Sequence, residues 1–295
     1  MPIDEVVLNF SPASLLLMNI ILAVVMFGVA LDLRLSDFKI LAALPRSALI
    51  GLLAQFALLP AVTYLLVLLA QPQPSMALGM FLVAACPGGN ISNFLTHVAN
   101  GNTALSVSLS ATSTLCAIVM TPLNFSLWGS LYPPAQNLLQ QIALSPLDLL
   151  QTIVLILGVP MSLGLLVSQR FPVWAERAKK PMRLFSMLVF LLFIVGALAA
   201  NFQHFLQYIG MVVLMVFVHN SLALLLGYSG ARVLKLPEKD RRAVAIEVGI
   251  QNSGLGLILI FDFFDGLGGM AIVTAWWGIW HLISGMALAL FWSRK

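Results

Sequence analysis

Nine long apolar stretches follow one another along this chain of 295 residues, and they limit its possible folds more than any other feature. A helix needs about 20 apolar residues to cross the roughly 30 Å hydrocarbon core of a membrane. Charged or Pro-rich segments separate the stretches and mark their ends. The predicted spans are 14–31, 47–69, 76–99, 103–127, 149–167, 182–200, 205–231, 243–261 and 269–292. The pattern predicts an all-α polytopic membrane protein with nine transmembrane helices.

The composition excludes an ordinary soluble enzyme. Hydrophobic residues make up 60% of the chain, charged residues make up 9%, and the mean hydropathy is +1.00. A soluble domain has about 25% charged residues. The connections between the predicted spans are too short to hold a soluble domain, so we expect residues 1–295 to form a single transmembrane domain. A carrier, a channel and an intramembrane enzyme all remain open at this point.

The Lys and Arg residues predict the orientation, because short cytoplasmic loops carry an excess of positive charge. All 15 basic residues lie within 34–46, 170–183, 232–242 and 294–295, after the odd-numbered spans. We therefore expect a multi-pass protein of the cell inner (plasma) membrane, with its N-terminus outside and its C-terminus in the cytoplasm. The net charge of +4 then reflects topology and contact with the lipid bilayer, not binding to nucleic acid. No obligatory protein partner is implied.

Two spans contain residues that interrupt a helix. The third span holds Cys86-Pro-Gly-Gly-Asn-Ile-Ser-Asn93, and the eighth holds Glu247-Val-Gly-Ile-Gln-Asn-Ser-Gly254. Pro removes a backbone donor and Gly weakens a helix, so both spans are predicted to be broken. Interrupted spans at corresponding places in two halves indicate a secondary transporter built from inverted repeats. Five spans separate the pair, which predicts two five-helix units, the first lacking its first helix.

The polar groups of the broken spans suit a hard cation. Glu247 lies inside a predicted span, where an ionisable group is costly and indicates function. Oxygen ligands and one negative charge would suit sodium. Further oxygen donors in the spans are Gln55, Asn90, Ser92, Asn93, Gln251 and Asn252, together with Ser106 and Ser110 on one helical face.

Each of these residues also has a structural interpretation. Glu247 follows Arg242 by five residues and is compatible with a first-turn carboxylate that complements the helix dipole. The hydroxyls of Ser106 and Ser110 are compatible with bonds back to helix carbonyls. Gln55 is compatible with an interhelical hydrogen bond, and His281 with a packing role.

Several motifs, taken in order, carry a family resemblance. The segment 86–93 is followed by Gly101-Asn-Thr-Ala-Leu-Ser106 and then by the segment 247–254. Further landmarks are Met26-Phe-Gly-Val-Ala-Leu31 with Asp37-Phe38, Gln55-Phe56 ahead of Pro60, and Trp280-His281. Together they closely resemble the bile acid:sodium symporter family, of bacterial type, over nearly the whole chain.

The resemblance implies a core domain of about 47–127 and 205–292 and a panel domain of about 14–31 and 149–200. Two broken helices would cross in the core beside two sodium ions, and substrate would bind between the domains. By similarity, the first sodium site takes Ser92, Asn93, Ser106, Ser110 and Glu247. The second takes Gln55, Glu247, Val248, Ile250 and Gln251. The residues implied for substrate binding are Asn90, Asn252 and His281.

The chain departs from the family at two positions. Ser110 stands where Thr is common, and the hydroxyl is kept. Leu282 follows His281 where a characterised bacterial branch has Asn, which changes the polar contacts available to a substrate. The resemblance therefore implies an organic anion, either a bile acid or another small carboxylate.

The resulting prediction is a sodium-coupled symporter of an organic anion that works by alternating access, with two sodium ions sharing Glu247. A proton-coupled anion carrier with Glu247 as the protonatable group is the alternative. An intramembrane enzyme is a remote one, because the four His residues fall in four segments without metal-ligand spacing. We therefore predict a transporter and not an enzyme.

Overall fold

The computed structural model describes residues 3–5, 12–32, 43–89, 91–142, 146–200 and 202–294. Regular structure in these residues is helical apart from one isolated bridge, so the all-α prediction is confirmed. The elements up to the middle of the chain are η1 Ile3–Glu5, α1 Pro12–Asp32, α3 Pro45–Leu53, η2 Ala54–Leu58, α4 Leu59–Ala70, α5 Pro74–Ala85, α6 Ile91–Val98, α7 Thr103–Ser130 and α8 Pro133–Ile142. The rest are α9 Pro146–Ile153, η3 Val154–Gly158, α10 Val159–Arg170, α11 Pro172–Ala200, α12 Phe202–Val233, α13 Glu238–Gly249, α14 Ser253–Phe263 and α15 Gly268–Ser293.

Four helical stretches in the described part are long and apolar enough to cross a membrane. They are Pro45–Ala70, Thr103–Ser130, Val212–Val233 and Gly268–Ser293, and they match the predicted second, fourth, seventh and ninth spans. Shorter apolar helices, Asn19–Leu31, Pro74–Ala85, Val154–Arg170 and Ser253–Phe263, overlap the first, third, fifth and eighth predicted spans. The sixth predicted span lies in α11. The count of nine membrane crossings stays a prediction.

Two of these spans contain a π-helical turn just before a proline. η2 precedes Pro60 and η3 precedes Pro160. Proline has no backbone N–H and its ring crowds the preceding turn, so the helix widens locally instead of continuing unchanged. The η2 turn contains Gln55, which is 1% exposed. The widened turn thus sets an amide side chain into the interior.

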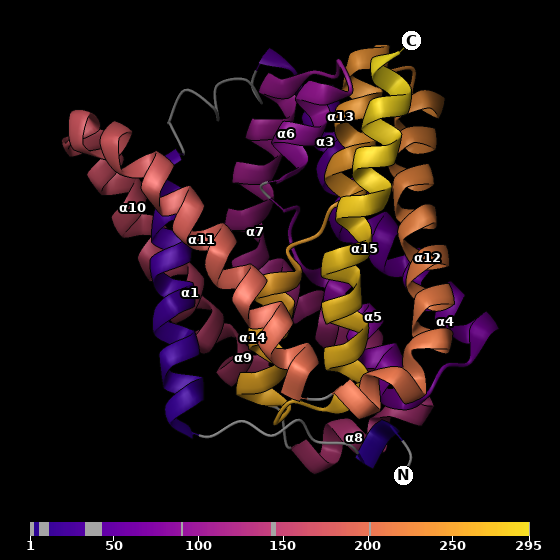
Figure 1. The fold of residues 1–295 in the computed structure, drawn as a ribbon. Helices are drawn as coiled ribbons and strands as arrows, with labels where there is room; N and C mark the ends of the chain where they lie inside the picture. Colours follow the sequence, from indigo (N-terminus) through magenta and orange to yellow (C-terminus); the bar gives the residue numbers. More distant parts are fainter. Residues whose placement is uncertain are drawn as a thin grey trace.

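The helices form two groups (Figure 1). Helices α1, α10 and α11 pack on one another at one side, and α5, α7, α12, α13 and α15 form the larger group. A Cβ added at Gly164 of α10 would lie 2.6 Å from the Ala30 side chain of α1, so glycine permits this close approach. The groups resemble the predicted panel and core, although the domain boundaries stay a prediction.

The two predicted helix interruptions are present. One lies between α5 and α6, the other between α13 and α14, and Gly88 of the first forms an antiparallel bridge with Gln251 of the second. The Gly89 amide donates to the Ile250 carbonyl (2.7 Å), and the Asn252 amide donates to the Pro87 carbonyl (2.9 Å). Each break therefore supplies hydrogen-bond partners that the other lost when its helix ended.

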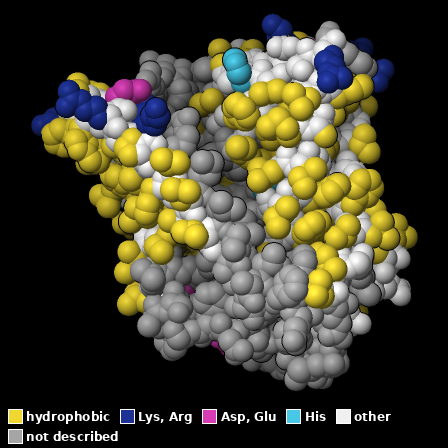
Figure 2. All heavy atoms as spheres, viewed as in Figure 1, with side chains coloured by type: hydrophobic (Ala, Val, Ile, Leu, Met, Phe, Trp, Pro, Cys, Tyr) yellow, Lys and Arg dark blue, Asp and Glu magenta, His cyan; other side chains and the backbone are white. Residues whose placement is uncertain are grey.

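Basic side chains gather at one end of the molecule. On the face drawn in Figure 2, Lys and Arg side chains lie at the end that also holds the C-terminus, whereas the N-terminus lies at the opposite end (Figures 1 and 2). Hydrophobic side chains cover much of the described flank between the ends (Figure 2). Exposed leucines of the described chain include Leu155 (65% exposed) and Leu192 (70% exposed). We call the first end the basic end. Which end faces the cytoplasm stays a prediction.

Candidate functional site

Glu247 is the centre of the site. It lies in the last turn of α13 and is 1% exposed. Its Oε2 atom accepts hydrogen bonds from the hydroxyls of Ser92 (2.8 Å) and Ser110 (2.7 Å), and its Oε1 atom accepts one from Ser113 (3.2 Å). A last-turn position contradicts the interpretation of Glu247 as a first-turn carboxylate that complements the dipole. The negative end of α13 faces it instead.

Asn93 completes this first cluster. Its Oδ1 atom accepts from Ser106 (2.9 Å) and lies 3.2 Å from the Ser110 hydroxyl, whose proton goes to Glu247 at the shorter distance, and the Ser92 and Ser110 hydroxyls lie 3.1 Å apart. The five residues predicted for the first sodium ion are thus joined in one hydrogen-bonded cluster. They come from α6, α7 and α13, which meet because both broken helices pack against α7.

Ser113 joins the same cluster and was missed in the sequence. Ser106, Ser110 and Ser113 follow the i, i+4, i+7 spacing of one helical face, so the signal was present. The Ser113 hydroxyl also lies 3.1 Å from the Ser110 carbonyl, so its proton is shared between that carbonyl and Glu247. Other hydroxyls of α7 bond back to helix carbonyls, as the structural interpretation expects. Ser108 donates to the Ala104 carbonyl (2.9 Å) and Thr114 to the Ser110 carbonyl (2.6 Å).

A second polar cluster is built around two glutamine side chains. Gln55 and Gln251, each 1% exposed, exchange amide hydrogen bonds of 2.9 and 3.1 Å. Gln55 also donates to the Cys86 carbonyl (2.7 Å) and Gln251 to the Val248 carbonyl (2.7 Å). Gln55 does connect helices, as its structural interpretation expects, and the group it reaches is the α5–α6 break.

The two clusters adjoin at the crossing of the breaks. A Cβ added at Gly88 would lie 2.0 Å from Glu247 Oε1, and Gly88 is bridged to Gln251. The Ile250 carbonyl faces the same crossing through its bond with Gly89. Carboxylate, hydroxyl, amide and backbone oxygens therefore converge in a buried region, and each hydroxyl keeps acceptor lone pairs besides its donated proton. Such a donor set fits a hard cation.

Comparison with known proteins identifies the chain. Residues 19–208 match the model of the Sodium Bile acid symporter family. The chain belongs to this family. It is 35% identical to an uncharacterized sodium-dependent transporter YocS of Bacillus subtilis over 277 residues, which cover 94% of this chain and 83% of that protein.

More distant relatives share the same long match. Identity is 30% over 274 residues to a probable sodium/metabolite cotransporter BASS1, chloroplastic, of Arabidopsis thaliana, covering 93% of this chain and 66% of that protein. Identity is 27% over 242 residues to the human ileal sodium/bile acid cotransporter, covering 81% of this chain and 67% of that protein. The family resemblance is confirmed, and the protein is a sodium-coupled membrane symporter, not an enzyme.

The residues predicted for substrate binding are only partly placed in the symporter. Asn90 lies outside the described residues. The Asn252 side chain accepts a bond from the Leu255 amide (3.0 Å) and so caps the N-terminus of α14. His281 is 5% exposed on α15, one turn before Gly285, which packs against Ile250. The substrate roles of Asn252 and His281 stay predictions.

Asp240 is a buried carboxylate that was missed in the sequence. It is 4% exposed and accepts bonds from Ser47 (2.6 Å) and Asn102 (2.8 Å). Its place among the basic residues of segment 232–242 suggested an exposed loop instead. The acid ties the first turn of α13 to the starts of α3 and α7.

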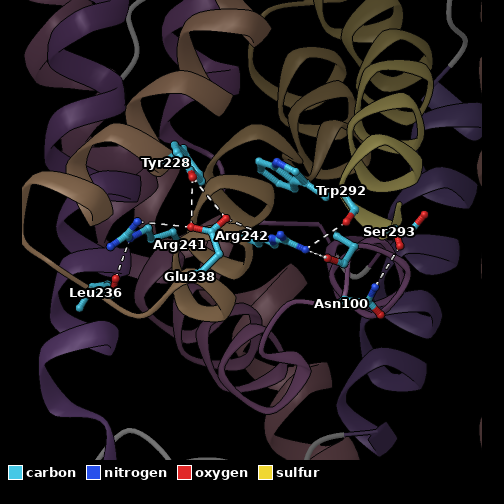
Figure 3. Close-up of polar contacts among 9 residues, drawn as sticks. Asn100, Tyr228, Leu236, Glu238, Arg241, Arg242, Trp292 and Ser293 are labelled. Atoms are coloured by element: carbon cyan, nitrogen blue, oxygen red, sulfur yellow. Dashed lines mark hydrogen bonds and ion pairs between the residues drawn. The ribbon is translucent and has the colours of Figure 1, made fainter. Parts of the chain in front are cut away.

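A neighbouring group of charged and aromatic residues holds the basic end together (Figure 3). Glu238 accepts bonds from Tyr228, Arg241 and Arg242, at 3.1 to 3.3 Å. Arg242 also donates to the carbonyls of Ala99 (2.8 Å) and Trp292 (3.2 Å), and its guanidinium lies over the Trp292 ring. These contacts join α12, α13, α15 and the end of α6, so the larger group is tied together at this end.

Proposed function

We propose that this symporter moves an organic anion together with two sodium ions, which bind at the two polar clusters and share Glu247. The observation that carries the proposal is a fully buried carboxylate at the end of a broken helix, surrounded by hydroxyl and amide oxygens. Sodium at the Ser92, Asn93, Ser106, Ser110 and Glu247 cluster, and at Gln55, Glu247, Val248, Ile250 and Gln251, would compensate that charge.

The energetics of Glu247 favour a bound cation. A carboxylate removed from water loses several kcal/mol of hydration unless it is paired. The C-terminal end of α13, which is the negative end of the helix dipole, lies beside the carboxylate, so the helix does not stabilise its charge. The hydroxyls of Ser92, Ser110 and Ser113 return part of the lost hydration. A sodium ion supplies the missing positive charge and lets the hydroxyls turn their lone pairs toward it.

Two sodium ions with one monovalent anion would move a net charge of +1. A membrane potential of 100 mV contributes about 2.3 kcal/mol per unit charge. The potential therefore adds to the sodium gradient in driving accumulation. Coupling requires that sodium binding order the paired breaks and so favour the state that binds substrate.

The larger architecture that we propose is nine transmembrane helices in two inverted repeats, with the core moving against the panel. The packing of α1, α10 and α11 as a separate group supports it. Helix α14 packs on α15 of the larger group. At the end opposite the basic end, Asn19 of α1 donates to Asp262 of α14 (2.9 Å) and so joins the two groups. In the proposed orientation, in the inner membrane, this contact lies on the outer side.

The proposed substrate is an organic anion, either a bile acid or another small carboxylate. Asn252 caps α14 at the crossing of the breaks, His281 is buried on α15, and the neighbouring Leu282 is 43% exposed. A leucine here offers apolar contact instead of an amide. The names of the relatives include both metabolites and bile acid, which supports the class without choosing within it.

Thermal unfolding of the purified symporter with a panel of bile salts and small carboxylates, in sodium against potassium chloride, tests the proposal. We expect sodium alone to raise the melting temperature, and one anion class to raise it further only in sodium. Uptake into proteoliposomes would then require a sodium gradient. Uptake that is independent of sodium and is driven by a pH gradient would contradict the proposal and support proton coupling through Glu247.

A further inference from the structure

Asn220 is a buried amide that reaches the second break. It lies on α12, is 0% exposed, and donates from Nδ2 to the Gly249 carbonyl at 2.7 Å. Gly249 is the last residue of α13, so its carbonyl is one of those that the break leaves without a helical partner. Asn220 therefore holds a peptide group that the helix itself does not.

The same side chain connects this break to α15. The Asn220 Oδ1 atom accepts a bond of 2.5 Å from the Ser284 hydroxyl. Ser284 also contacts the His281 carbonyl (3.3 Å) on its own helix. The amide thus links the end of α13 to the segment of α15 that carries His281.

Asn220 occupies the place in the second half of the chain that Gln55 occupies in the first. Gln55 lies on the span before the first broken helix and donates to the Cys86 carbonyl at that break (2.7 Å). Asn220 lies on the span before the second broken helix and donates to the carbonyl at that break. Both amides are buried, and the breaks pair antiparallel through Gly88 and Gln251. One amide per break is the arrangement expected of inverted repeats.

Gly249 makes this tether necessary. A Cβ added there would lie 2.2 Å from Leu224 of α12, so the close packing requires glycine. Glycine leaves the backbone free to rotate more than any other residue does. The Val248 carbonyl is held by Gln251 and the Ile250 carbonyl by Gly89, so the Gly249 carbonyl between them is the one for which Asn220 supplies the partner. The carbonyls on either side belong to Val248 and Ile250, which are proposed sodium ligands.

We propose that Asn220 is a positioning residue for the second sodium site. By holding the Gly249 carbonyl it orients the neighbouring carbonyls of Val248 and Ile250, and Ser284 holds the amide in place. The inference rests on the proposed function, because it concerns the sodium site of that function. It adds a residue that touches neither ion nor substrate.

The test uses sodium alone as the probe. The sodium concentration that gives half of the maximal thermal stabilisation, with potassium replacing sodium at constant ionic strength, is measured for wild type, Asn220→Ala and Ser284→Ala. We expect this half-maximal sodium concentration to rise about tenfold in Asn220→Ala, because one hydrogen bond is lost. Ser284→Ala keeps the donor to Gly249, so its rise should be smaller, about two- to threefold.

Asn124→Ala is the matched control. Asn124 is also buried (6% exposed), and it donates to a helix carbonyl, that of Met120 (3.1 Å), within α7. Its loss should lower the melting temperature in potassium without moving the sodium midpoint. A purely structural Asn220 would behave in the same way.

The outcomes separate the inference from the proposed function. If wild type responds to sodium and Asn220→Ala has the same midpoint as Asn124→Ala, the positioning role is wrong while the proposed function stands. If wild type shows no sodium response, both are wrong. Should Asn220→Ala fail to fold, Ser284→Ala decides, and an unchanged midpoint there overturns the positioning role.

Discussion

Burial of the Glu247 charge is the main energetic cost of the site. The carboxylate is buried, lies at the unfavourable end of α13 and is surrounded by three serine hydroxyls. Neutral hydroxyl donors offset only part of the cost of burying a charge. At the scale of the residue, the symporter therefore needs a cation to make the site favourable.

Replacing Glu247 with Gln tests this need for charge, since the shape is kept and the charge is removed. We expect the sodium midpoint of thermal stabilisation to rise at least about a hundredfold, because a charge-assisted contact worth about 3 kcal/mol is lost. The variant should still insert into the membrane. Glu176→Gln, on the exposed part of α11, is the control and should leave the midpoint unchanged. A Glu247→Gln protein with wild-type sodium response would rule out the site assignment.

Ser113 gives a second prediction at this scale. Its hydroxyl reaches Glu247 Oε1, so Ser113→Ala should raise the sodium midpoint about three- to tenfold, through the loss of one hydrogen bond. Ser108→Ala is matched to it, because Ser108 lies on the same helix and bonds to the Ala104 carbonyl. The same titration compares them. Equal midpoints for the two variants would show that Ser113 is not part of the sodium site.

The paired breaks are the decisive feature at the scale of the elements. Each helix ends near the middle of the core, and the extended residues between the half-helices bond to each other instead of to water. Broken backbone is tolerated in a membrane only where such partners exist. Gln55, Asn220 and Thr121, which donates to the Ala85 carbonyl (2.7 Å), satisfy further carbonyls near the breaks.

Gly88→Ala tests the closeness of this crossing. The added methyl group would lie 2.0 Å from Glu247 Oε1, so the carboxylate or the break must move. Overpacking of this kind costs about 1–3 kcal/mol, and we expect sodium-dependent stabilisation to be lost. Gly210→Ala is the control, because a Cβ there meets nothing within 4 Å. If sodium stabilised the Gly88→Ala protein as much as the Gly210→Ala protein, the result would contradict the geometry of the crossing.

At the scale of the whole molecule, packing divides the helices into a group tied at the basic end and a smaller group of α1, α10 and α11. The Glu238 and Arg242 contacts hold helix ends within the larger group, whereas the Asn19–Asp262 bond joins the two groups at the other end. Movement of one group against the other would preserve the Glu238 and Arg242 contacts and break the Asn19–Asp262 bond.

The orientation of the whole molecule can be measured with single cysteines. Lys179, near the start of α11, lies on the proposed cytoplasmic side, and the exposed Asp265, between α14 and α15, lies on the proposed outer side. We expect Lys179→Cys to react with a membrane-impermeant thiol reagent only in inside-out vesicles, and Asp265→Cys only in intact cells. The native cysteines Cys86 and Cys116 are replaced by Ala in both variants. The protein with these two replacements and no added cysteine gives the background reaction. The reverse pattern would invert the proposed topology.

Much of the fold could be predicted because its causes are local. Apolar stretches of membrane length and the Pro and Gly residues at 86–93 and 247–254 determine helices and their breaks through the backbone alone. The family resemblance then brought Ser92, Asn93, Ser106 and Ser110 to Glu247, and the structure joins them in one cluster. The partners of Ser113, Asp240 and Asn220 were not foreseen.

The sequence by itself determined the helical membrane fold, the two interruptions and the presence of one carboxylate among oxygen donors. Only the tertiary structure decided which polar groups meet. Ser113 reaches Glu247 across 134 positions, Asp240 reaches Asn102 across 138, and the breaks pair through Gly88 and Gln251. The reason is physical: a helix or a break follows from local backbone preferences, whereas a buried polar group takes its partner from whichever helix packs against it.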